Sequence, residues 1–180
     1  MDKNKHFAVF DIKAFYASFE CVERGLDPFT TPLVVTDTSR KESTIVLSVS
    51  PFLKALGVPS RCRRKDLPTN IPGMIYAVPQ MEKYVKKSAE IVSIFLDYFG
   101  IDDIHIYSID ELFIDLTPYL KLYKKAPDVL CKDIQKEIFN KTGLTLTCGI
   151  GPNMFLAKVA DDHDAKYAKD YIAYWTNDNF

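Results

Sequence analysis

The chain has 180 residues, of which 47% are hydrophobic and 26% charged, and its formal net charge is −1. This length suits one domain, or one domain with a small insertion, and the composition excludes a disordered or collagen-like protein. A free-standing nucleic-acid binder usually has a basic excess. If this chain acts on DNA, its basic residues must therefore cluster on one face, or much of the binding surface must lie elsewhere.

Targeting signals and metal-binding cysteine motifs are both absent from the sequence. No apolar run is long enough for a membrane helix, and the starting segment MDKNKHFAVFDI has too short an apolar stretch for a signal peptide. We therefore expect a cytoplasmic protein. The four cysteines are scattered without a CxxC pair, which argues against a zinc site or a disulfide framework.

The first predicted elements are a short strand and a helix. An apolar run from Phe7 to Phe10 ends at Asp11, and a helical pattern follows from about Ala14 to Glu23. The acid therefore lies where the predicted strand gives way to the helix.

A small inserted subdomain is predicted at roughly residues 28–75. Two β-rich runs, at 33–36 and 44–49, are separated by the polar segment DTSRKES, which is typical of a hairpin connection. A short helix is predicted at 51–56, and the rest of the subdomain is a loop that contains glycine and several prolines.

The next elements are a long helix and a hairpin. Residues 81–99 carry apolar side chains at the three-and-four spacing of an amphipathic helix, which the following glycine ends. Two strands, 105–109 and 112–116, then flank Asp110 and Glu111. The pattern predicts a hairpin with acids at its tip.

The last elements are a helix at about 128–140, a strand at 144–150, a helix that starts at Asn153, and a final strand in the tail DYIAYWTNDNF. Without the insertion, the order of elements predicts an α+β fold of ferredoxin-like type, an antiparallel sheet with helices on one face. In that fold the first strand lies beside the central hairpin. Asp11 and Asp110 would then approach each other although they are 99 positions apart.

Three converging carboxylates, Asp11, Asp110 and Glu111, would repel one another unless a cation lay between them. Carboxylate oxygens suit Mg²⁺, and two such ions could support an in-line phosphoryl transfer. The spacing alone favours a simpler interpretation, in which Asp110 and Glu111 are ordinary turn acids and Asp11 is a helix cap.

Four segments carry a resemblance to a known family. FDIKAFYASFE at 10–20 closely resembles the first motif of Y-family DNA polymerases, and YSIDELFIDL at 107–116 closely resembles their third. KALGVPS at 54–60 is similar to their fingers segment, and TCGIGPNMFLAK at 147–158 is similar to a further block. The segments occur in the family's order, and the UmuC/ImpB/MucB/SamB-like branch is the most similar.

The resemblance implies template-directed DNA synthesis past damaged bases, with low fidelity. It implies a polymerase palm at residues 1–27 and 76–180 and a fingers subdomain at 28–75. It also implies thumb and little-finger domains, which these 180 residues do not contain.

Site roles follow from the same resemblance. Asp11, Asp110 and Glu111 would hold two Mg²⁺ ions, with the backbone carbonyl of Ile12 as a further ligand. Tyr16 is similar in position to the steric gate, an aromatic ring that would clash with the 2′-hydroxyl of a ribonucleotide. Composition alone would make Tyr16 an ordinary core aromatic.

Further residues are implied at the nucleotide and the DNA. Lys54 and Lys166 would bind the triphosphate, and Phe15 lies beside the gate, where it is interpreted as a core residue of the nucleotide-binding segment. A basic cluster could meet DNA or form a solvated loop; its arginines are Arg61, Arg63 and Arg64.

The implied partners are primer–template DNA and a deoxynucleoside triphosphate, with a sliding clamp or recombinase bound through regions outside this chain, and no membrane. Two other functions stay open. The chain could be a non-catalytic interaction module of a repair polymerase. It could also be a nucleotide cyclase, although SIDE at 108–111 replaces the Gly-Gly-acid hairpin expected there.

Overall fold

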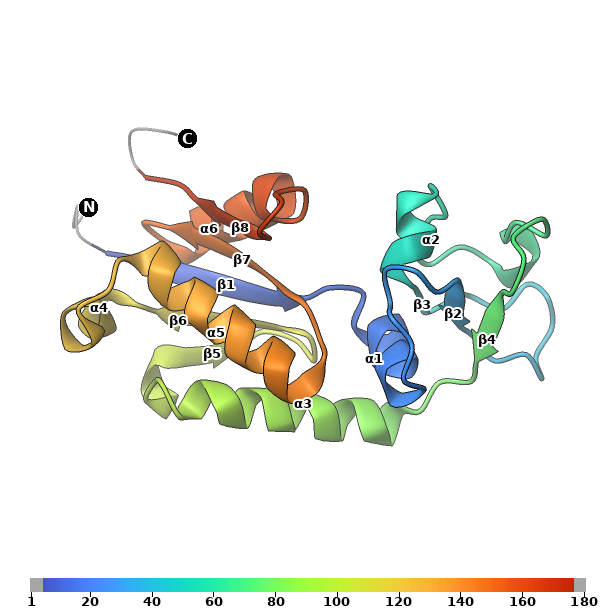
Figure 1. Cartoon of the computed structure of the whole chain (residues 1–180), viewed down its shortest axis with the longest axis horizontal. Coiled ribbons are helices and arrows are strands. Elements are labelled where there is room, and N and C mark those ends of the chain that lie inside the picture. The colour runs from blue at the N-terminus through green and yellow to red at the C-terminus, as the bar shows by residue number, and fades with distance from the viewer. Residues whose placement is uncertain (1–4, 177–180) are drawn as a thin grey trace. The chain divides into compact units, whose positions relative to one another are not determined.

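The computed structural model describes residues 5–176, which form two compact units (Figure 1). One unit is built from the chain up to Ile12 together with the chain from Lys87 onward, and the other is Lys13–Lys86. The division into palm and fingers at residues 28 and 75 stays a prediction. Within residues 5–176, no helix is both long and apolar enough to span a membrane.

The first unit contains a five-stranded sheet in the order β5-β6-β1-β7-β8. Strand β1 pairs antiparallel with both β6 and β7, while β8 is added at the edge in parallel with β7. The α+β class predicted from the sequence is confirmed. The strands are β1 Phe7–Ile12, β5 Ile104–Ile106, β6 Glu111–Asp115, β7 Leu146–Gly151 and β8 Ile172–Tyr174.

Alternation along β1 divides its side chains between the two faces of this sheet. Phe10 packs edge-on against Phe95, with ring centroids 4.9 Å apart, on the face where helices α3 (Met81–Leu96) and α5 (Pro127–Thr142) lie (Figure 1). Val9 points to the opposite face, where it packs with Ala157 of helix α6. Asp11 is two residues beyond Val9 and therefore belongs to the α6 face.

Helix α6 (Met154–Ala160) begins at an N-cap and lies very close to β7. The side chain of Asn153 accepts a hydrogen bond from the Leu156 N–H at 2.9 Å. A Cβ atom at Gly149 would lie 2.1 Å from the Ala157 carbonyl oxygen and 2.4 Å from the Asp161 nitrogen. Only glycine allows this approach, and it brings the end of α6 onto the sheet.

A π-helical turn, Asp161–Ala165, follows α6 directly. Its widened hydrogen bond runs from the Lys166 N–H to the Asp161 carbonyl oxygen, 3.1 Å away. Such turns insert one residue into helical spacing and often occur at functional sites.

The second unit is built around a three-stranded sheet in the order β3-β2-β4. Strand β2 pairs antiparallel with β3, as the predicted hairpin connection requires, and parallel with β4. The buried side chains of this unit include Val34, Val49 and Leu53 as well as the aromatic rings of Phe15 and Phe19. The elements are β2 Leu33–Val35, β3 Ser48–Val49, β4 Ile75–Ala77, α1 Phe15–Glu23 and α2 Pro51–Ala55.

Several boundaries differ from those predicted. The strand predicted at 44–49 is reduced to β3, because Ile45 makes only an isolated bridge to Arg63. Helix α3 ends at Leu96, not at residue 99. Elements that were not predicted are α4 Thr117–Tyr123 and the 3₁₀ turns Arg64–Asp66 and Ile101–Asp103. They are short segments in which local patterns carry little signal.

Gly149→Ala should lower the free energy of unfolding by about 3 kcal/mol or more, because the new Cβ would clash with rigid backbone atoms. Chemical denaturation followed by circular dichroism would measure the change. Gly100→Ala is the matched control: its Cβ would lie 3.2 Å from the Tyr119 hydroxyl, at the end of a side chain that can shift. Equal losses for the two variants would contradict the close packing of α6 on β7.

Candidate functional site

The register of β1 and β6 places two acids side by side. Asp11 is the direct partner of Glu111 across the antiparallel pair. The Ile12 N–H donates to the Asp110 carbonyl oxygen at 2.9 Å, which ties the hairpin tip to the end of β1. The proximity predicted for the first strand and the hairpin tip is confirmed.

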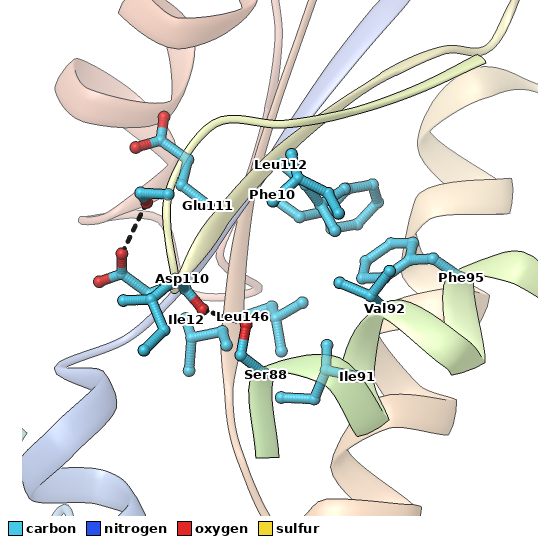
Figure 2. Close-up of a pocket in the computed structure, with 13 residues that line it drawn as sticks. Phe10, Ile12, Ser88, Ile91, Val92, Phe95, Asp110, Glu111, Leu112 and Leu146 are labelled. Atoms are coloured by element: carbon cyan, nitrogen blue, oxygen red, sulfur yellow. Dashed lines mark hydrogen bonds between the residues drawn. The ribbon is translucent and has the colours of Figure 1, made fainter. Parts of the chain in front are cut away.

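Asp110 lies at the hairpin tip, but its carboxylate makes different contacts from those of Asp11 and Glu111. The Ser108 hydroxyl donates to Asp110 Oδ1 at 2.8 Å, and the Ser88 hydroxyl donates to the Ile109 carbonyl oxygen (Figure 2). Within residues 5–176, the group of carboxylates whose oxygens lie close enough to share one cation includes Asp11 but neither Asp110 nor Glu111.

Apolar side chains lie beneath the hairpin tip that carries the acids. Figure 2 shows the carboxylates of Asp110 and Glu111 on the side of the hairpin away from Val92 and Phe95. The small pocket beneath the tip is lined mainly by apolar side chains of β1, β6 and α3. Leu112 and Phe113, which follow Glu111 in β6, are buried, so packing as well as strand pairing fixes the position of Glu111.

Two lysines reach the acids from α6 and the π-helical turn. Lys166 Nζ lies 2.9 Å from Asp11 Oδ2 and 2.6 Å from Asp162 Oδ1. Lys158 Nζ lies 2.9 Å from Glu111 Oε1, 3.7 Å from Asp11 Oδ2 and 3.1 Å from Asp162 Oδ1. Each ammonium group therefore bridges carboxylates that are far apart in the sequence.

Asp161 is a buried acid beneath this network. Its side chain is 0% exposed, and the Thr147 hydroxyl is the neighbouring polar group that favours its ionised form. The ammonium nitrogens of Lys166 and Lys158 lie 3.6 and 3.9 Å from Asp161 Oδ2. Oxygens of Asp161, Asp162 and Asp11 all lie within 4.8 Å of one another.

The two ammonium groups compensate only part of the carboxylate charge in this cluster. Burial raises the pKa of Asp161 to about 6, and the nearby charge of Asp11 adds to the effect. Burial likewise raises the pKa of Glu111, although Lys158 opposes it. Burial lowers the pKa of Lys166, but its carboxylate partners outweigh burial and leave that pKa raised. Four carboxylates around two ammonium groups leave an excess of negative charge.

Tyr16 and Phe15 lie on α1 in the other unit. Tyr16 is partly exposed and stacks on Tyr84, with ring centroids 4.5 Å apart. Phe15 is buried, in agreement with its interpretation as a core residue. A positive φ of 50° at Ala14 sets the start of α1, so the backbone turns sharply before the two aromatic residues.

Glu20 is a buried acid that binds the hydroxyl of Tyr84, the residue on which Tyr16 stacks. The carboxylate of Glu20 accepts hydrogen bonds from the Tyr84 hydroxyl, the Gln80 amide and the Arg24 guanidinium. Burial alone would raise the pKa of Glu20, but these donors outweigh burial and lower it. The network joins α1 to the first turn of α3 and holds Tyr84 in place.

The remaining predicted residues lie on the surface of the same unit. Lys54 is exposed on α2, whose N-cap is Ser50. Arg64 donates to the carbonyl oxygens of Thr38 and Arg40, so it has a structural contact within its own loop. Arg61 and Arg63 are exposed.

Sequence reasoning missed three residues of the acidic cluster: Lys158, Asp161 and Asp162. A signal was present, because Lys158 ends the segment TCGIGPNMFLAK, and the two acids lie three and four residues after it in a helical pattern. That spacing indicates a lysine and two acids on one face.

Comparison with known proteins identifies the family. The family model described as impB/mucB/samB matches residues 10–162. The chain belongs to the impB/mucB/samB family. The match includes Asp11, Asp110 and Glu111, as well as Lys158 and Asp161.

Individual relatives are longer than this chain. It is 36% identical over 172 residues to UvrX of Bacillus subtilis (strain 168), and this match covers 95% of the chain and 40% of that protein. It is 34% identical to DNA polymerase IV 2 of the same organism, over 99% of the chain and 42% of that protein. The chain thus spans about two-fifths of these impB/mucB/samB relatives.

Solved structures agree with the family. A Y-family DNA polymerase chimera of Dbh and Dpo4 matches with a TM-score of 0.82 at 26% identity, over 96% of the chain and 49% of that structure. DinB from Sulfolobus solfataricus matches with a TM-score of 0.78 at 25% identity, over 96% of the chain and 49% of that structure. The architecture of this impB/mucB/samB chain is thus that of about half of a Y-family polymerase structure.

Glu20→Gln should destabilise the chain at neutral pH by about 2 kcal/mol, because three donors would lose a charged acceptor. The folded-state pKa of Glu20 lies below its ordinary value of 4.5, so its contribution is present above that pH and is lost as the pH falls through the folded value. Urea unfolding between pH 7 and pH 3 should show that the difference in free energy of unfolding between the wild type and Glu20→Gln becomes smaller in acid. Glu23→Gln, at an exposed position on the same helix, is the control. A difference in free energy of unfolding that does not depend on pH would contradict the role of the ionised Glu20 carboxylate.

Proposed function

We propose that this chain is the catalytic part of a translesion DNA polymerase, which joins a deoxynucleotide to the 3′ end of a primer. The single observation that carries the proposal is the pairing of Asp11 with Glu111 inside an acidic cluster that retains excess negative charge. The family match and the names of the relatives support the reaction class.

Carboxylate oxygens are the ligands that a hard divalent cation prefers. Asp11 and Glu111 are 17% and 11% exposed, and burial raises the pKa of Glu111, so a nearby dication would stabilise its ionised form. Asp110 and the Ile12 carbonyl would complete the set. Bound Mg²⁺ would assist deprotonation of the primer hydroxyl and neutralise charge on the triphosphate.

The residues of the chain would divide the remaining work. In the reaction, the primer 3′ oxygen forms a bond to the α-phosphorus while the bond to the pyrophosphate oxygen breaks. Lys166 would place a positive charge near the leaving phosphates, and exposed Lys54 would contribute a second. Tyr16, held on Tyr84, would contact the sugar and reject a 2′-hydroxyl.

Template and primer DNA would be the macromolecular partner. The formal net charge of −1 gives little general attraction for phosphates. The relatives are more than twice as long as this chain, and the remainder of such a protein would supply more of the DNA contacts. Arg61 and Arg63 are the exposed basic candidates in this chain.

Asp11→Asn should reduce Mg²⁺-dependent binding of a deoxynucleoside triphosphate at least tenfold, since it removes one charge from the cation site. Titration calorimetry with and without Mg²⁺ measures the effect. Asp102→Asn, at an exposed position near α3, changes the charge equally and should leave binding unchanged. Unaltered binding in Asp11→Asn would contradict the proposed site.

Tyr16→Ala should admit ribonucleoside triphosphates, with their binding rising to within about threefold of the matching deoxynucleotide. The same calorimetric titration compares the two sugars. Tyr16→Phe keeps the ring and should still discriminate. If Tyr16→Ala discriminates as well as the wild type, the gate is another residue.

A further inference from the structure

Lys158 occupies the space between the two acids that are proposed to hold metal. Its ammonium nitrogen lies 2.9 Å from Glu111 Oε1 and 3.7 Å from Asp11 Oδ2. A Mg²⁺ ion bound to the same oxygens would lie about 2.1 Å from each. The ammonium group and the metal therefore cannot be in this place together.

The ammonium group of Lys158 pairs with a largely buried carboxylate, that of Glu111. Its nitrogen lies 2.9 Å from Glu111 Oε1, an oxygen that is buried. The contact is an ion pair at the edge of the site, where solvent reaches the ammonium group and weakens the attraction. Lys158 is 28% exposed and has a flexible side chain, so it can leave Glu111 at modest cost.

Asp161 is a second carboxylate that the ammonium group of Lys158 can reach. It lies three residues after Lys158, with Oδ2 only 3.9 Å from the ammonium nitrogen. The side chain of Asp161 is fully buried, and its backbone is held against Gly149. A buried carboxylate in a rigid position stabilises any cation that moves toward it.

We propose that Lys158 competes with the divalent metal at Asp11 and Glu111, and that Asp161 accepts its ammonium group when metal enters. The inference rests on the proposed function and adds regulation of the same site. In the nucleotide-free chain Lys158 keeps metal affinity low.

The test measures binding of Mn²⁺ alone to the 180-residue chain, by the electron paramagnetic resonance signal of free Mn²⁺. Lys158→Met keeps the length of the side chain and removes the competing charge, so it should bind Mn²⁺ at least tenfold more tightly than the wild type. Lys132→Met is the matched control, because Lys132 pairs with Asp170 on the exposed side of α5. It should bind within about twofold of the wild type. Equal affinities for Lys158→Met and the wild type would overturn the proposal.

A double-mutant cycle tests the part assigned to Asp161. Asp161→Asn should weaken Mn²⁺ binding at least threefold more in the wild type than in the Lys158→Met background, since it removes the acceptor for the displaced ammonium group. Equal weakening in both backgrounds would mean that Asp161 acts on the metal directly, and would overturn its assigned part. If Lys158→Met fails to fold, Lys158→Gln takes its place.

Asp11→Asn separates failure of this inference from failure of the proposed function. If Asp11→Asn abolishes Mn²⁺ binding while Lys158→Met leaves it unchanged, the metal site stands and the competition is wrong. If Mn²⁺ binding is indifferent to Asp11, the proposed site itself is wrong, and the competition fails with it.

Discussion

The antiparallel pairing of β1 with β6 is the constraint on which the candidate site depends, because it places Asp11 directly opposite Glu111. Two carboxylates at neighbouring positions repel each other unless positive charge lies close by. The approach of α6 to β7 at Gly149 supplies that charge by bringing Lys158 and the π-helical turn onto the same face. The strand register, Gly149 and the π-helical turn together bring the carboxylates and the lysines to one face of the sheet.

Much of this arrangement could be predicted from the sequence. The apolar run that ends at Asp11 and the hairpin with Glu111 near its tip are local patterns, and the α+β fold brings them together. The helix predicted at about 128–140 is present as α5, which ends at Gly143, a glycine with a positive φ of 71°. Phe15 was correctly interpreted as core, because a large aromatic side chain is most often buried there.

The rest could not be read from local patterns. The π-helical turn has no sequence signal of its own, and it decides that Asp161 points inward while Lys166 returns to Asp11. Nor does sequence show that the Asp110 carboxylate pairs with Ser108 apart from the other acids. Short strands such as β3 depend on partners distant in the chain, so their lengths were overestimated.

The most direct test of the account is the anomalous diffraction signal of Mn²⁺ in crystals of this chain grown with the metal. The account predicts a peak between the carboxylates of Asp11 and Glu111, with the Lys158 ammonium group moved from Glu111 toward Asp161. A peak at a different set of acids, or Lys158 still at Glu111 with metal bound between Asp11 and Glu111, would contradict it.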